Sequence, residues 1–273
     1  MLAFATPAAN KLHRVLIIAL AALLPVAFTA CGTPHTTVGM PAKAAAVPLN
    51  SSVTPSILLF TGTGTSASDV SAVEAILGAN SLTYSTANSS QLNGMSETTL
   101  KGYKLLIVPG GNSITIGNNL KSSTTTNIHN AVINDGLHYL GICAGGFFGG
   151  YSIYNGLNLT SGVWFNFYAD YNKGIHKEAA SISSKGATAL DQYWQDGPQF
   201  SGWGYIVGKY PDGTPAIVEG SSGKGWVMLA GVHPEAPASW RTGMTFKTSV
   251  ATDNAYAGTL ILAALNGTSL THY

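Results

Sequence analysis

The chain has 273 residues, of which only 9% are charged, with 13 Lys and Arg against 12 Asp and Glu. Its formal net charge is +1, and it has no Lys/Arg cluster that could follow a phosphate backbone, which argues against nucleic-acid binding. The length is enough for one α/β domain with additional terminal segments.

The first 30 residues have the pattern of a lipoprotein signal peptide. Lys11 and Arg14 precede an apolar stretch at 15–30 that is short for a membrane span and ends in small residues directly before Cys31. We expect Cys31 to become the lipidated N-terminus after cleavage. Ordinary secretion with cleavage nearby and a retained membrane anchor are the alternatives. All three readings predict an extracytoplasmic domain, and lipidation predicts the bacterial membrane as a partner.

The chain contains only two cysteines, Cys31 and Cys143. Lipidation of Cys31 leaves Cys143 without a disulfide partner in the chain, so a free thiol is predicted. Residues 31–54 are rich in Pro, Ala, Ser and Thr without periodicity, which is typical of a flexible tether. One domain is expected at 55–267, followed by a short tail at 268–273.

The first half of that domain repeats a pattern of apolar strand, Gly-containing turn and amphipathic helix. The first unit has a strand at 56–60, a turn at 61–66 and a helix at 67–79. The second has a strand at 103–111 and a helix at 126–136, and the third begins with a strand at 137–142. This order predicts a flavodoxin-like α/β fold, with a mainly parallel sheet, helices on both faces and ligands at the carboxyl ends of the strands.

Past residue 150 the pattern becomes that of short, turn-separated strands, which predicts an antiparallel β extension. The segments concerned are 156–165, 177–184, 203–210, 214–220 and 225–232, with a final helix around 254–265.

Cys143 is expected at the carboxyl end of the strand at 137–142, where glycines lead into a helix. This is the geometry of a nucleophile elbow, in which a tight turn exposes the nucleophile and the helix N-terminus favours a thiolate. Gly141, Gly145 and Gly146 would avoid steric conflict in such a turn. Taken alone, a cysteine is more often a small buried side chain.

A base, an orienting carboxylate and oxyanion donors can be assigned along the same edge. The strand at 223–232 leads to His233 and Glu235, which point to the same side of an extended segment, so the carboxylate could orient the imidazole. The backbone N–H groups of Ala144 and Gly111 are the candidates for an oxyanion hole.

Together these motifs resemble the class I glutamine amidotransferase superfamily, and within it the amidotransferase-like N-terminal domain of biotin protein ligases, which also occurs alone in bacteria. The resemblance covers most of residues 55–240. It rests on the following motifs: "FTGTGTS" at 60–66, "VPGG" at 108–111, "YLGICAGGFFG" at 139–149, "YWQDGPQF" at 193–200 and "GKGWVMLAGVHPE" at 223–235. It implies a Cys-His-Glu triad of Cys143, His233 and Glu235 with a glycine oxyanion loop.

The departures from the family limit the expected function. No biotinyl-adenylate-forming domain follows, so biotin ligation is not expected, and no synthase domain is present to receive ammonia from glutamine. Two functions remain: a cysteine hydrolase or acyl transferase acting on an amide, peptide or ester, and a non-catalytic module that binds a small molecule or peptide on the same fold.

Two further features have alternative readings. The glycine loop could contact substrate through Gly62, Gly64, Thr65 and Gly110, or it could be a plain turn, since it lacks the lysine of a P-loop. Aromatic residues at 164–171 and 193–200 could line the site or belong to the core. No metal and no cofactor is predicted, because the histidines lack ligand spacing and there is no CxxC motif.

Overall fold

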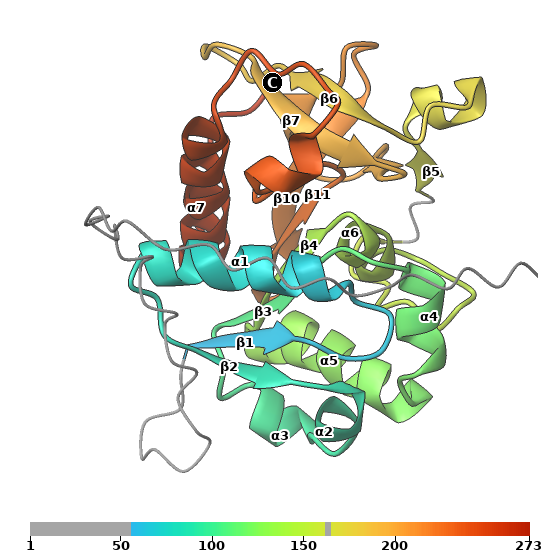
Figure 1. The fold of residues 1–273 in the computed structure, drawn as a ribbon. Helices are drawn as coiled ribbons and strands as arrows, with labels where there is room; N and C mark the ends of the chain where they lie inside the picture. Colours follow the sequence, from blue (N-terminus) through green and yellow to red (C-terminus); the bar gives the residue numbers. More distant parts are fainter. Residues whose placement is uncertain (1–55, 162–164) are drawn as a thin grey trace, which may run out of the picture. The chain divides into compact units, whose positions relative to one another are not determined.

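A seven-stranded sheet organises the domain (Figure 1). The computed structural model describes residues 56–161 and 165–273. In spatial order the strands are β2 (Tyr84–Ala87), β1 (Ile57–Phe60), β3 (Leu105–Val108), β4 (His138–Ile142), β11 (Gly225–Ala230), β10 (Pro215–Ser222) and β9 (Tyr205–Lys209).

The first five of these strands run parallel, and β10 and β9 continue the sheet in antiparallel fashion. This confirms the predicted α/β class with a mainly parallel sheet and an antiparallel extension. The strand at 225–232 was predicted as part of the antiparallel extension, but the corresponding β11 pairs in parallel with β4, with Val227 opposite Tyr139. The segment after β11 therefore leaves the sheet at the same edge as the segment after β4.

Helices cover both faces of the sheet. α1 (Ala67–Ala79) and α7 (Val250–Asn266) pack on one face, where Ile57 and Leu59 of β1 share a core with Val73 and Ile261. The other face belongs to a second core, in which the remaining residues of β1 meet the following helices: α2 (Ser89–Asn93), α3 (Glu97–Leu100), α4 (Ser113–Asn118), α5 (Ser122–Asp135) and α6 (Ala144–Gly149). Successive side chains of β1 therefore point alternately into two separate cores.

Two small antiparallel sheets lie outside the main one. β6 (Lys177–Ile182) pairs with β7 (Leu190–Gln195), and β5 (Asn166–Phe167) pairs with β8 (Pro198–Gln199). Short 3-10 helices span Ala169–Lys173 and Ala238–Arg241. An isolated bridge between Tyr193 and His233 ties β7 to the segment after β11.

The strand predicted at 156–165 is not found in the described part of that segment, 156–161 and 165. Leu157 and Leu159 are buried at alternate positions, which explains the strand-like pattern. Their N–H groups donate to the carbonyl oxygens of Phe148 and Gly149, so the segment packs as a loop against the end of α6.

The terminal segments predicted from the sequence differ in how far the structure describes them. The predicted signal peptide, Cys31 and the tether at 31–54 lie outside the described residues. Residues 268–273 carry no helix or strand, but the Glu219 carboxylate accepts hydrogen bonds from the N–H of Leu270 (2.6 Å) and the hydroxyl of Ser269 (2.9 Å). Within 56–161 and 165–273, no helix combines the length and hydrophobicity needed to cross a membrane.

Candidate active site

Cys143 occupies a strained turn between β4 and α6. Its backbone has φ 49° and ψ −104°, a combination that non-glycine residues rarely adopt. The turn is held by a hydrogen bond from the N–H of Cys143 to the carbonyl oxygen of Ala230 in β11 (2.7 Å). This is the elbow that the sequence predicted, and it sets the thiol at the carboxyl edge of the parallel strands.

Glycines permit the close backbone approaches around the elbow. A Cβ on Gly141 would lie 2.2 Å from the carbonyl oxygen of Gly145, and a Cβ on Gly145 would lie 1.9 Å from that of Val108. The contact at Gly146 is looser, since its nearest atoms would be 3.2 Å away. Two of the three glycines expected to be necessary therefore have no room for a side chain.

His233 and Glu235 lie together after β11. Nδ1 of His233 is 2.9 Å from Oε1 of Glu235, and both side chains are buried. The N–H of His233 donates to the carbonyl oxygen of Tyr193 (2.8 Å), which fixes the backbone beneath the ring. The predicted pairing of imidazole and carboxylate is present in the structure.

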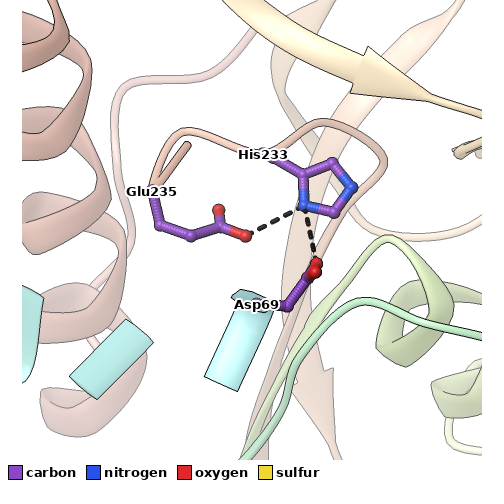
Figure 2. Close-up of side chains that lie close together, drawn as sticks. All are labelled: Asp69, His233 and Glu235. Carbon is purple, nitrogen blue, oxygen red and sulfur yellow. Dashed lines mark hydrogen bonds and ion pairs between the residues drawn. The ribbon is translucent and has the colours of Figure 1, made fainter. Parts of the chain in front are cut away.

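A second carboxylate, that of Asp69, reaches the same ring nitrogen. Oδ1 of Asp69 is 3.3 Å from Nδ1 of His233, and Figure 2 shows Asp69 and Glu235 approaching that atom from different sides. Gly110 makes room for this contact, because a Cβ there would lie 2.0 Å from Oδ1 of Asp69 and 2.6 Å from Cε1 of His233. His233 is thus held between two acids, where the sequence predicted one.

These contacts govern the protonation of His233. Burial by itself would lower the pKa of His233, but the negative charges of the Cys143 thiolate and the Glu235 carboxylate raise that pKa well above its usual value. Burial also raises the pKa of Glu235, while the charge of His233 opposes that shift. The arrangement therefore favours an imidazolium at His233 whenever Cys143 is a thiolate.

A cavity of about 850 Å³ opens beside Cys143 and His233. Gly111 and Ala144 also line it, and within the described part of the chain the N–H groups of these two residues donate to no protein acceptor. Both residues predicted to supply oxyanion donors therefore line the cavity that Cys143 lines. The thiol itself donates to the carbonyl oxygen of Gln195 (3.5 Å).

The residues predicted as possible substrate contacts are not among those that line the cavity. None of Gly62, Gly64, Thr65 and Gly110 lines the cavity, whereas Ser66, Ser68 and Asp69 do. The carbonyl oxygen of Gly62 accepts hydrogen bonds from the N–H (3.1 Å) and Oγ1 (2.7 Å) of Thr65, closing a turn. The N–H of Asn112 donates to the carbonyl oxygen of Gly64 (2.8 Å), so this turn positions the loop that contains Gly111.

The aromatic residues divide between the two expected roles. Trp194 and Phe200 are buried in the core. The cavity is instead lined by a separate group: Phe147, Phe167, Tyr171, Tyr193 and Trp240.

Asp69 is the residue that sequence reasoning missed. Asp69, Val73 and Ile76 lie on one buried face of α1, at spacings of four and three residues. An acid on an apolar helical face was the available signal. Asp69, His233 and Glu235 also offer ligand atoms within 4.8 Å of one another, so these three described residues could hold a metal ion, although the histidine spacing had suggested none.

Comparisons with known proteins bear on the family and the fold of this chain. Residues 55–191 match the model of the family described as the N-terminal domain of biotin-protein ligase. A structure described as a glutamine amidotransferase is similar at 20% identity and a TM-score of 0.52, over 66% of this chain and 90% of that chain. This likeness concerns the fold.

Two glycosidases are also among the similar solved structures. An exo-β-1,4-mannosidase from Opitutaceae bacterium strain TAV5 has 12% identity and a TM-score of 0.48, covering 76% of this chain and 36% of that one. A β-galactosidase from Rahnella sp. R3 has 13% identity and a TM-score of 0.49, covering 78% and 32%. No curated protein matches the sequence.

Proposed function

The chain belongs to the family of the N-terminal domain of biotin-protein ligase, and we propose that it is a cysteine hydrolase or acyl transferase acting on an amide, peptide or ester. The observation that supports this proposal most strongly is the buried hydrogen bond between His233 and Glu235 at a cavity that Cys143 also lines. A nucleophile and a base on one cavity, with an acid that orients the base from behind, form the arrangement that acyl transfer requires.

The reaction begins when the thiol turns from Gln195 toward Nε2 of His233, because Nδ1 already faces the carboxylates. The proton of the thiol passes to Nε2, and the thiolate sulfur attacks the acyl carbon to form a carbon–sulfur bond. The carbonyl electron pair moves onto oxygen and then returns, expelling the amine or alcohol, which takes the proton from Nε2. Water, or an acceptor amine or alcohol, then attacks the thioester and gives its proton to Nε2, which restores the thiol as the product leaves.

The surrounding groups stabilise this sequence of charges. The N–H groups of Ala144 and Gly111 are the donors for the developing oxyanion. Glu235 fixes the orientation of the His233 ring and stabilises the imidazolium through its hydrogen bond to Nδ1. The scheme requires no group other than substrate and water or acceptor.

We expect p-nitrophenyl acetate to place a single acetyl group on Cys143 at neutral pH. The expectation follows because an activated ester needs only the nucleophile and its base, whatever the natural substrate is. Intact-mass spectrometry after rapid quenching would detect the adduct, and peptide mapping would locate it. Cys143→Ser should reduce acylation at this position to the level of the uncatalysed reaction.

Ser239→Ala is the matched control, because Ser239 lines the same cavity and, like the side chain introduced by Cys143→Ser, carries a hydroxyl group. It should leave the adduct on Cys143 unchanged. Equal acylation of the parent chain and Cys143→Ser would rule out the thiol as the nucleophile. Absence of acylation in a folded parent chain would favour the binding module.

We further propose that the domain is tethered to a bacterial membrane on its extracytoplasmic side through lipidated Cys31. The support is the signal-like sequence before Cys31. In a bacterial host fed an alkyne-bearing fatty acid, the full chain should incorporate the label and fractionate with membranes. Cys31→Ala should lose the label, whereas Cys143→Ala should keep it. Label that persists in Cys31→Ala would refute this attachment point.

A further inference from the structure

Asp69 carries a charge that the proposed acyl-transfer scheme does not use. The residue is 6% exposed and lines the cavity beside Cys143. Within the described residues its carboxylate accepts no hydrogen bond, and its single ion pair is the 3.3 Å contact with Nδ1 of His233. Nδ1 has one proton, and the shorter contact of that atom, 2.9 Å, is with Glu235. The carboxylate of Asp69 is therefore largely removed from water, and its partner among these residues is the ring of His233.

The charges around the thiol leave a deficit of cations. Two carboxylic acids, Asp69 and Glu235, contact the single imidazole of His233, which lines the cavity together with Cys143. The cavity has two further charged residues, Asp196 and Lys177. Asp196 already pairs with His176 at 2.9 Å, and Lys177 is exposed at the start of β6. A cationic group entering beside Asp69 would offset this deficit.

Two aromatic rings line the same cavity as Asp69 and pack against the same histidine. Tyr193 and Trp240 line the cavity with their centroids 5.4 Å apart, and each packs against His233, at 5.8 Å and 5.5 Å. Ring faces attract ammonium groups, and the attraction strengthens where water is excluded. A desolvated carboxylate beside two rings has the composition of a site for an organic ammonium ion.

We propose that the substrate carries a protonated amine, which Asp69 binds next to the rings of Tyr193 and Trp240 while Cys143 attacks the acyl carbon. The substrate class is then an amide or ester with a free ammonium group close to the scissile bond. This inference rests on the proposed function, because only an enzyme has a substrate. Binding of an ammonium ion at Asp69 can nevertheless be tested without turnover.

The test compares thiol reagents of equal chemistry and different charge. A full-length Cys31→Ser chain in mild detergent has Cys143 as its single thiol. Aminoethyl, ethyl and sulfonatoethyl methanethiosulfonate each transfer their sulfenyl group to the thiolate, forming a disulfide and releasing methanesulfinate. Relative to a free cysteine derivative, Cys143 should favour the aminoethyl over the ethyl reagent by about tenfold. Asp69→Asn should abolish that preference.

Asp196→Asn is the matched control, because it removes an equal charge from the same cavity and should retain most of the preference. A uniform loss of rate with all three reagents in Asp69→Asn would reduce Asp69 to a positioning residue for His233 and overturn the proposal. An equal preference for the aminoethyl reagent in Asp69→Asn and in the parent chain would also overturn the proposal. The proposal would likewise be overturned if the parent chain showed no such preference.

A second measurement avoids dependence on the folding of the variant. In the Cys31→Ser chain, butylammonium should slow alkylation of Cys143 by iodoacetamide, and butanol at equal concentration should not. Equal effects of the two compounds would contradict an ammonium site. Failure of the proposed hydrolase function can be distinguished from failure of the ammonium site. In that case p-nitrophenyl acetate would leave no acyl adduct on Cys143, while Cys143 would still prefer the aminoethyl reagent.

Discussion

Replacing His233 with alanine should slow the alkylation of Cys143 by iodoacetamide about 100-fold at pH 6, and by only a few-fold at about pH 9.5. The reason is that the raised pKa of His233 keeps its ring protonated through neutral pH when Cys143 is a thiolate. The imidazolium stabilises the thiolate, so the two charges form and disappear together. The measurement is the second-order rate constant against pH in the Cys31→Ser chain.

The sign of the pH dependence follows from the direction of that shift. The ion pair persists below the folded-state pKa of His233 until the thiolate itself is protonated, and it is lost as the pH rises through that pKa. In His233→Ala the thiol has no cationic partner, and a thiol with an ordinary pKa of about 8.5 is only about 0.3% ionised at pH 6. At high pH both chains hold a thiolate, and the difference shrinks.

His129→Ala is the control for this experiment, because His129 bonds the carbonyl oxygen of Leu157 and does not line the cavity. It should keep the parent profile. If His233→Ala also kept that profile, His233 would have no influence on the thiol, and the proposed hydrolase would lose its base. A thiol inert at every pH would point to the binding module.

The part of the site that could be predicted is the part coded by consecutive residues. A strand followed by Cys143 and glycines is a local pattern, and so is a strand followed by His233 and Glu235. Because β4 and β11 are parallel neighbours, their carboxyl ends meet at one edge, and the two local patterns are brought together.

The parts that could not be predicted depend on contacts between distant segments. Asp69 gives no stronger sequence signal than an acid on the apolar face of α1, and its contact with His233 joins segments that are far apart in the sequence. β7 was not expected as a strand, since its burial depends on pairing with β6 and on the bridge to His233. Tyr193 is placed at the cavity by those pairings, so the sequence left the role of this aromatic residue open.

Replacing Gly145 with alanine should lower the free energy of unfolding by about 3 kcal/mol or more, although alanine is the better helix former. A Cβ at this position would lie 1.9 Å from the carbonyl oxygen of Val108, and main-chain atoms of β3 cannot yield as a flexible side chain can. Relief requires α6 to move away from the sheet, and Cys143 at its start must move with it. Urea unfolding followed by circular dichroism measures the loss.

Gly146→Ala makes this prediction specific to the elbow, because it adds the same methyl group one residue later. Its nearest neighbours, including the carbonyl oxygen of Ala230 and the ring of Phe200, would be 3.2 Å away. A shift of a few tenths of an ångström accommodates them, so we expect a change within about 1 kcal/mol. Gly145→Ala should also slow alkylation of Cys143 under folding conditions, whereas Gly146→Ala should not. Equal stability of the two variants would show that the approach of α6 to β3 is not what fixes the thiol at the strand edge.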